Sequence, residues 1–488
     1  MMKKIIKMLL LFIILSIMFS CSDNNDTNTK ENGENFETTM SDQIEENTFY
    51  GLEIQNFEGK VFNILYRGDQ DYAADYSIYV ESDTGEIVDS AVYKRNRSVE
   101  ETYNIKINAI AINGNWENRD NFNNTVINSV YAGDGAFDLI DYYAGYVCDA
   151  ISANILLALN EIDSINLESP WWSQIAAEKL NVNGKIFTIP GDLSLNLWSH
   201  ILTIFFNKTV LNDYNINEDI YKLVNDGNWT VEKFNAISRI IYIDIDGNGE
   251  YNINDAYGVA FVDDLQFNNF HYALNIPITT KDSDGFIKLN TDSNEVDNMI
   301  SYLYAMIYET DGVKFFQGKE NDVNLMFQEN RLLFMPTLLG NAEKLRDMDS
   351  DFGIIPYPKS SEEQSFYGTT SRDQHTLFCI PIDVKDIDFA GIITEALCVA
   401  SYHEVVPIYY DIVLKNKYTR DDDSALMLDL IREGLSFDFG AVYSLSLERA
   451  GYFVRDVLYQ KKTDSASYFA ANSEKYYSSL ETFLECFK

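Results

Sequence analysis

The chain has 488 residues, of which 76 are Asp or Glu and 37 are Lys or Arg, so its formal net charge is −39. This charge excludes binding to nucleic acid or to an anionic lipid surface through the overall field of the protein. The length suits two domains, and a hydrophobic fraction of 46% is enough to build a core in each.

The N-terminus has the three parts of an export signal. A cationic start with three lysines is followed by an apolar stretch from Met8 to Phe19 and by small Ser20 before Cys21. Residues 17–21 resemble a bacterial lipobox, which predicts that residues 1–20 are removed and that Cys21 is lipidated. An ordinary signal peptide or an uncleaved anchor is the alternative. Either way, the rest of the chain is expected outside the cytoplasm, on the outer face of a bacterial cell membrane if Cys21 carries lipid.

Residues 21–49 are expected to form a flexible tether, because this polar segment has too little apolar surface to fold. The other cysteines show no CxxC or Cys/His clustering, so they are expected to be small buried hydrophobes, with their pairing left open. They are Cys148, Cys379, Cys398 and Cys486. The four histidines of the chain lack metal or triad spacing, which counts against most hydrolase chemistry.

Apolar patterns in the first part of the body predict the order β-α-β-α-β. The predicted strands cover residues 61–65, 105–110 and 137–140, and the predicted helices cover 89–103 and 120–131. This order implies a mainly parallel sheet covered by helices.

Further strands are predicted along the rest of the chain, over residues 184–190, 202–207, 331–335, 352–356 and 376–380. Thr230 is a suitable N-cap for a helix with Val231, Phe234 and Ile237 on one side. From residue 390 onward the pattern is mostly helical.

Seven short segments in this order resemble the extracellular solute-binding proteins of ABC importers, family 1, the group that contains sugar-binding proteins. The resemblance covers about residues 55–480. The segments that carry it are Asp134–Leu139, Ser169–Trp172, Gly184–Asp192, Phe205–Lys208, Asp226–Thr230, Phe327–Met335 and Gly353–Lys359.

The resemblance implies an α/β fold of the periplasmic-binding-protein type II, with two lobes that each have a mainly parallel sheet flanked by helices. The solute would be trapped between the lobes as they close. On this chain the first lobe would comprise residues 50–190 and 358–405, and the second lobe residues 191–357 and 406–488. Pro and Gly near residues 190 and 356 suit chain crossings between two sheets.

In this family, loops after the strands and the inter-lobe crossings line the cleft, where aromatic rings and polar groups would meet a sugar. The residues of this chain that fall on such loops are Tyr66, Arg67, Asp69, Tyr142, Tyr143, Asp192, Trp198, Thr337 to Gly340, Tyr367, Arg372 and Asp373. Core packing is the competing interpretation for each aromatic residue, and Trp198 is the strongest single candidate because it follows a strand-ending Pro-Gly-Asp.

Residues 244–255 match a calcium-binding loop of the EF-hand type. Oxygen-bearing side chains occupy loop positions 1, 3, 5, 9 and 12, Gly249 occupies position 6, and position 7 would lend a backbone carbonyl. The predicted ligands are Asp244, Asp246, Asn248, Glu250, Asn252 and Asp255. Asp255 replaces the usual Glu at the last position. The cofactor would be structural calcium, and an ion-free turn rich in Asn and Asp is the alternative.

The leading functional hypothesis is a monomeric, lipid-anchored receptor that binds a carbohydrate, with an oligosaccharide as the first expectation, and delivers it to ABC permease subunits without chemistry. A surface glycosidase or lyase is the alternative from a different class, although no catalytic motif supports it. A ligand sensor or adhesin on the same fold is the third hypothesis. The identity of the solute stays open.

Overall fold

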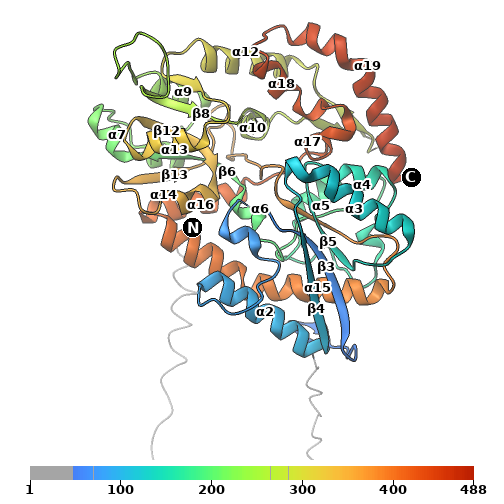
Figure 1. Ribbon diagram of the computed structural model, residues 1–488. Helices are drawn as coiled ribbons and strands as arrows, with labels where there is room; N and C mark the ends of the chain where they lie inside the picture. The colour runs from blue at the N-terminus through green and yellow to red at the C-terminus, as the bar shows by residue number, and fades with distance from the viewer. Residues whose placement is uncertain (1–47, 70, 264, 284) are drawn as a thin grey trace, which may run out of the picture. The chain divides into compact units, whose positions relative to one another are not determined.

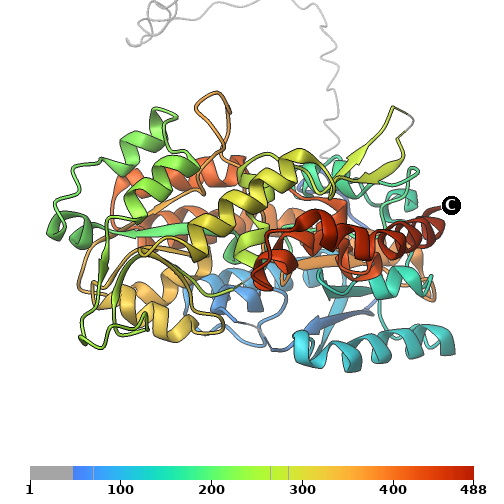
Figure 2. The same ribbon diagram turned by 90° about the horizontal axis from the view of Figure 1, so that it is seen from above.

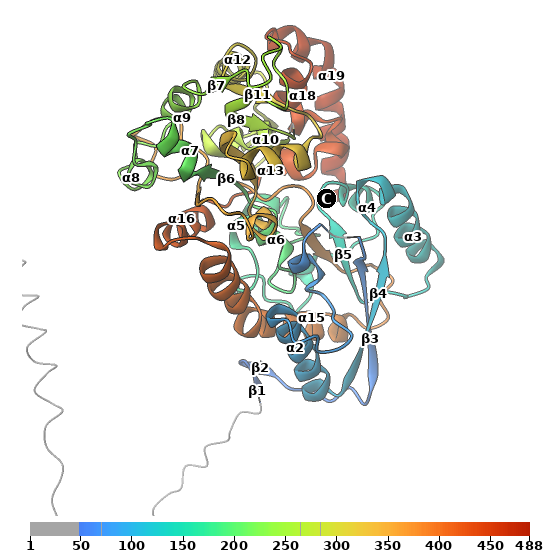
Figure 3. The same cartoon turned by 60° about the vertical axis from the view of Figure 1, so that its left-hand side comes forward.

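The computed structural model describes residues 48–488 except residues 70, 264 and 284 (Figure 1). The predicted signal peptide, Cys21 and nearly all of the predicted tether lie outside the described residues. The described chain builds two α/β halves, each with its own sheet, which Figure 3 shows one above the other.

The sheet of the first half has the strand order β14-β5-β3-β4. Strand β3 (Lys60–Arg67) is parallel to β4 (Ile105–Ile112) and to β5 (Leu139–Tyr143), whereas β14 (Thr376–Cys379) is antiparallel to β5. The three strands predicted at the start of the body are therefore present. The third begins two residues later than predicted, at Leu139, and includes Tyr142 and Tyr143.

Helices pack on this sheet through aromatic contacts. Helices α2 (Ile87–Tyr103) and α3 (Arg119–Ala132) match the two predicted helices, and α15 (Ile387–Glu404) packs against α2. The ring of Phe389 on α15 lies 5.8 Å from that of Phe62 on β3, and the ring of Phe122 on α3 lies 5.2 Å from that of Tyr142 on β5.

The sheet of the second half has the order β11-β8-β12-β6-β13, with β7 beside β8. Strands β8, β11, β12 and β13 run in one direction, and β6 and β7 run in the other. The bounds are β6 Leu202–Asn207, β7 Tyr242–Ile243, β8 Ala256–Phe261, β11 Val313–Phe315, β12 Leu332–Leu338 and β13 Phe352–Ile355.

Helices α9 (Val231–Ser238), α13 (Glu320–Gln328) and α16 (Asp422–Glu433) pack on β8, β12 and β13. The predicted N-cap of α9 is confirmed, because the Thr230 hydroxyl accepts the Lys233 N–H. The longest other helices are α12 (Asn294–Tyr308) and α19 (Ser465–Leu484).

The shorter elements connect these strands and helices. They are β1 Thr48–Phe49, β2 Leu52–Glu53, α4 Cys148–Ser152, α5 Gln174–Leu180, α6 Asn196–Ser199, α7 Lys208–Asp213, α8 Ile220–Asn225, α10 Leu265–Asn268, α11 Phe270–Ala273, β9 Thr279–Lys281, β10 Ile287–Leu289, α14 Ala342–Leu345, α17 Phe439–Val442 and α18 Phe453–Tyr459.

Three chain crossings join the halves. The first, before β6, and the second, before β14, pair side by side: the Leu202 N–H donates to the Thr370 carbonyl over 3.0 Å, and the Arg372 N–H donates to the His200 carbonyl over 2.8 Å. The third crossing, between α15 and α16, contains the π-helix Ile408–Tyr418.

Two sequence predictions differ from the structure here. Residues 184–190 form isolated bridges instead of a strand, because only Ile189 meets another strand, at Phe378. The predicted lobe boundary at residue 358 also differs from the observed contacts. Lys359 exchanges backbone hydrogen bonds with Trp229 and Val231 of the second half, so the chain re-enters the first half only near β14.

The C-terminal tail, residues 434–488 after α16, contacts both halves (Figure 2). In the second half the Tyr308 hydroxyl donates to the Leu458 carbonyl over 2.8 Å. Toward the first half, the Thr188 and Tyr443 hydroxyls lie 3.1 Å apart, and the Lys185 ammonium donates to the Lys488 carbonyl over 2.7 Å. The tail therefore bridges the two halves on one side of the crossings.

One helical stretch of the described chain, Ile387–Lys415, is long and apolar enough to cross a membrane, but 78% of its most apolar window is buried in the protein. A helix that is buried to this extent belongs to the core of the protein. Cys379 and Cys398 are also buried and, like Cys148 and the less buried Cys486, are free thiols. The prediction of small buried hydrophobes is confirmed for Cys148, Cys379 and Cys398.

Arg95 on α2 is fully buried and has no carboxylate within ion-pair distance among the described residues. Its guanidinium donates to the carbonyls of Ser77, Ile78 and Leu193 and to the Ser401 hydroxyl. Burial lowers the pKa of Arg95 to about 10, so the group stays charged at neutral pH. Arg95 thus joins α2 and α15 to the first crossing.

Arg95→Met should lower the free energy of unfolding by about 3 kcal/mol, because each buried carbonyl left without a partner costs about 1 kcal/mol or more. Arg97→Met is the control on the same helix. The Arg97 side chain is 41% exposed and pairs with Glu100, so its loss should cost less than about 1 kcal/mol. Urea denaturation measures both variants, and equal small losses would contradict the role of Arg95.

Candidate functional site

A cleft of about 710 Å³ lies between the two halves, and its walls come from both sheets, the second crossing and the tail. From the first half it is lined by Asp71, Tyr72, Asn115, Trp116, Glu117 and Tyr143. From the second half the lining includes Asp263, Gln266, Asn324, Thr337, Asn341 and Lys344. The crossing adds Arg372, Asp373 and Gln374, and the tail adds Arg449, Tyr452 and Arg455.

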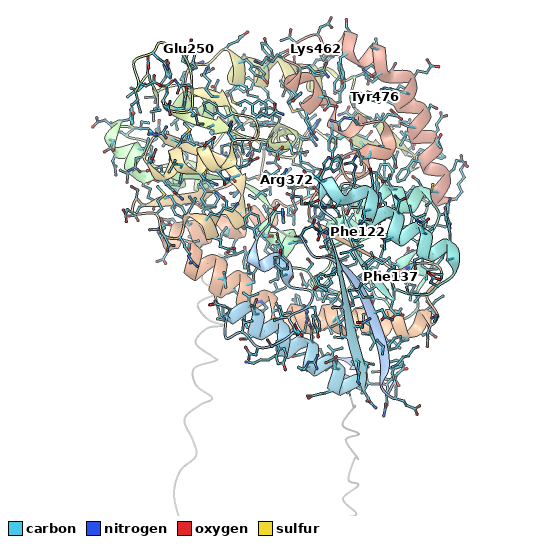
Figure 4. All side chains as sticks on the ribbon, in the orientation of Figure 1. Phe122, Phe137, Glu250, Arg372, Lys462 and Tyr476 are labelled. Carbon is cyan, nitrogen blue, oxygen red and sulfur yellow. The ribbon has the colours of Figure 1, made fainter. Side chains whose placement is uncertain are left out.

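The floor of the cleft is an ion pair next to a hydrogen-bonded carboxylate. Arg372, near the centre of the molecule in Figure 4, lies 2.6 Å from Asp263 at the end of β8. Burial alone would lower the pKa of Arg372, but Asp263 and Asp373 outweigh burial and raise it. The Tyr452 hydroxyl donates to Asp373 over 3.0 Å, and the Tyr143 hydroxyl lies 3.5 Å from the same carboxylate.

Asp71 is a second fixed carboxylate, on the wall of the first half. His200, whose imidazole lies 4.0 Å away, and Gln374, which donates to Asp71 over 2.6 Å, together lower the pKa of Asp71 to about 2. The Asp71 side chain is 53% exposed, so this charged acceptor faces the cleft.

Four aromatic residues line the cleft, Tyr72, Trp116, Tyr143 and Tyr452, and only the Trp116 ring is exposed. Trp116 is 36% exposed and carries the Arg119 guanidinium 4.7 Å from its ring. Tyr72 lies opposite Lys344 of the second half, whose ammonium is 5.1 Å from the ring, and Tyr452 belongs to the tail. Such rings, placed among carboxylates, amides and guanidinium groups, suit the apolar face and the hydroxyl edges of a sugar.

Five of the predicted binding residues line the cleft: Tyr143, Thr337, Leu338, Arg372 and Asp373. Thr337 lies on β12 itself and not on a loop, because the strand continues to Leu338. The structure thus brings together residues from the first sheet, the second sheet and the second crossing, as the resemblance implied.

The remaining first-half residues predicted to bind ligand do not line this cleft. Tyr66 and Arg67 belong to β3, and buried Arg67 lies 3.3 Å from Asp141 and donates to the Gln374 carbonyl. Tyr142 is buried in the core, where its hydroxyl donates to Asn123. The Asp69 carboxylate is engaged by backbone groups of a neighbouring loop. It accepts the N–H groups of Gly114 and Asn115 and so shapes the loop that carries Trp116.

Asp192, Trp198 and Tyr367, which were predicted at the crossings, do not line this cleft either. Trp198 is buried behind the crossings, with its ring 4.9 Å from the Arg432 guanidinium. Burial raises the pKa of Asp192 to about 7, against the opposing effect of Arg432. The Tyr367 hydroxyl donates to the Val224 carbonyl within the second half.

The sequence analysis missed Tyr72, Trp116 and Tyr452. The sequence did contain a signal for Trp116. This residue follows β4 in a polar segment, just as the residues predicted to bind ligand follow the first and third predicted strands. The sequence contained no such signal for Tyr452, because only the folded tail brings this residue to the cleft.

The predicted calcium loop lies between β7 and β8. Figure 4 shows Glu250 at the outer edge of the second half, away from Arg372. Carboxylate oxygens of Asp244, Asp246 and Asp255 lie within 4.8 Å of one another, which fits a shared cation. Asn252 points its amide nitrogen at Asp246, so the amide would have to turn for its oxygen to act as a ligand.

Asp244 also shapes the loop, since it accepts the N–H groups of Gly247 and Gly249. Both glycines have positive φ, +69° and +76°, which the tight turn requires. Asn248 accepts the Glu250 N–H, so its side chain is engaged within the loop.

Comparison with known proteins agrees at the level of the fold. No protein-family model matches the chain. No curated protein matches it either. Among solved structures, the galacto-N-biose/lacto-N-biose I-binding protein of an ABC transporter from Bifidobacterium longum, in complex with lacto-N-biose, superposes with a TM-score of 0.59 at 11% identity, covering 88% of this chain and 99% of that one.

Two further structures are similar. The GacH receptor of Streptomyces glaucescens gives a TM-score of 0.53 at 11% identity, covering 88% of this chain and 97% of that one. The maltose/maltodextrin-binding domain MalE from Bdellovibrio bacteriovorus, bound to maltotriose, gives 0.51 at 13% identity, covering 87% and 100%. The chain thus has the two-lobed α/β fold of the sugar-binding receptors of ABC transporters, as its sequence predicts.

Proposed function

We propose that the protein is an extracytoplasmic receptor that binds a carbohydrate, in the first instance an oligosaccharide, in the cleft between its halves and delivers it to an ABC permease. The observation that carries the proposal is the composition of the cleft, in which the exposed ring of Trp116 shares the lining with carboxylate, amide and guanidinium groups contributed by both halves. Its volume falls in the range of small-molecule sites, about 300–1,000 Å³. The proposal includes a monomer held to the outer face of the membrane by lipid on Cys21.

Two carboxylates of the cleft favour binding over catalysis. A glycosidase needs one carboxyl group that stays protonated to donate to the leaving oxygen. Asp71 is held ionised by its neighbours, and Asp263 is engaged by Arg372. Both are suited to accept hydrogen bonds from sugar hydroxyls, and neither is suited to give up a proton.

A thermal-shift screen of residues 22–488 with oligosaccharides, and with peptides as controls, tests the proposal. A saccharide at about a hundred times its dissociation constant adds about 2.7 kcal/mol to the stability of the native state and should raise the melting temperature. Trp116→Ala should weaken binding about tenfold, because a stacked ring contributes about 1 kcal/mol or more.

The control is Tyr131→Ala, which removes a ring that is 67% exposed on α3 and outside the cleft, and it should leave the affinity unchanged. Mass spectrometry of the recovered saccharide separates a receptor from an enzyme. Recovery of cleaved saccharide, or a shift with peptides alone, would overturn the proposal.

We also propose that the loop of residues 244–255 holds a structural calcium ion, which the three converging carboxylates support. The loop joins β7 to β8, so the ion would stabilise that connection.

EDTA should therefore lower the melting temperature of the protein relative to excess calcium, since an ion that binds only the native state stabilises it. Asp246→Ala should remove this difference. Asp226→Ala, at an exposed carboxylate paired with Lys222, is the control and should keep it. Identical melting of the wild type in calcium and in EDTA would show that the loop binds no calcium.

A further inference from the structure

A small inner pocket opens beside the floor of the cleft. Its volume is about 40 Å³, and it shares Leu202, Leu265, Arg372, Asp373 and Tyr452 with the cleft lining. A water molecule needs about 10–15 Å³ of such space, so the pocket accepts two or three atoms of that size. It is therefore too small for a sugar ring and large enough for a substituent on one.

Four buried polar groups that line this pocket have an atom without a hydrogen-bond partner. They are His375 Nε2, Asn268 Oδ1, Asn269 Nδ2 and Ser371 Oγ. Each residue is at most 6% exposed. A buried polar atom left unpaired costs about 1–3 kcal/mol, so four of them around one pocket indicate a missing polar occupant.

The hydrogen-bonding capacity of the four atoms defines that occupant. His375 Nδ1 lies 2.7 Å from the Arg372 carbonyl and must donate to it, which leaves Nε2 as an acceptor. Burial lowers the pKa of His375 to about 4, which keeps the ring neutral. Asn268 Oδ1 also accepts, Asn269 Nδ2 donates and the Ser371 hydroxyl does either. The occupant must both donate and accept, as a neutral hydroxyl does and a carboxylate does not.

Part of the remaining pocket wall is apolar. Ala144 comes from the end of β5, Leu202 and Leu265 from the second half, and Val442 from the tail. An occupant that presents a carbon to this wall and an oxygen to the four polar atoms fits better than water alone. The exocyclic hydroxymethyl group of a hexose has this composition.

We propose that the inner pocket is a specificity subsite for a hydroxymethyl group of the bound sugar, with ordered water in its place in the free protein. The proposal rests on the proposed function, because it assigns one substituent of the solute to the floor of the same cleft. It predicts that hexose units are preferred over pentose units of the same stereochemistry.

Matched saccharide pairs test the proposal by isothermal titration calorimetry. Cellotriose and xylotriose, glucose and xylose, and galactose and arabinose differ by the hydroxymethyl group, and the saccharide with the largest thermal shift is compared with its 6-deoxy form. The wild type should bind the hydroxymethyl-bearing member at least tenfold more tightly.

Ala144→Val fills the pocket and should abolish this preference by weakening only the hydroxymethyl-bearing member. Ser371→Ala removes one hydrogen-bonding group at nearly constant volume and gives the same readout if Ala144→Val is poorly folded. If a saccharide binds and neither variant changes the preference, or if the preference is absent, the subsite is wrong and the receptor function stands. If no saccharide binds at all, both proposals fail.

Discussion

The ion pair between Arg372 and Asp263 is the contact on which the arrangement of the cleft depends. Arg372 lies on the second crossing, and Asp263 lies just beyond β8, so the 2.6 Å contact holds the crossing against the second sheet. The next residue, Asp373, accepts a hydrogen bond from Tyr452 of the tail and lies beside Tyr143 of the first sheet. Removing one partner of such a partly buried pair leaves an unpaired charge and costs about 3–5 kcal/mol when burial is complete.

The same contact fixes the floor of the cleft before any solute arrives. The Arg372 side chain is 27% exposed, so it faces the cleft while its orientation is set by the protein. A polar group that is already oriented loses little conformational entropy on binding, and this favours affinity. The two paired crossings connect the halves next to this floor.

The two halves are also joined by contacts of the tail and of β9. The tail reaches both halves, and Lys281 on β9 of the second half donates to the carbonyls of Glu178 and Asn181 in the first. Contacts of this kind oppose sliding of the halves.

The sequence predicted the fold well, because strong apolar periodicity marks β3, α2, β4 and α3, and because turn residues mark the crossings. Individual cleft residues were harder to predict. Trp198 and Trp116 both follow segments predicted as strands, yet Trp198 lies on α6 and packs on Arg432, whereas Trp116 lines the cleft. The difference depends on which side of the sheet each segment takes, which is a tertiary property.

Tyr452 shows a second reason for failure. It is distant in sequence from every strand and reaches the cleft only because the tail folds back between the halves. Arg67 shows a third, since a charged residue at a strand end became a buried partner of Asp141. A pairing of this kind depends on the neighbouring strand, which sequence spacing does not reveal.

The central claim is that one saccharide contacts both halves and the crossing at once. Hydrogen–deuterium exchange of the protein, with and without the saccharide that stabilises it, tests this claim most directly. Added protection should appear together in residues 115–117 of the first half, 335–341 of the second half and 372–374 of the crossing. Protection confined to one half, or to the β9–β10 side of the molecule, would contradict the account.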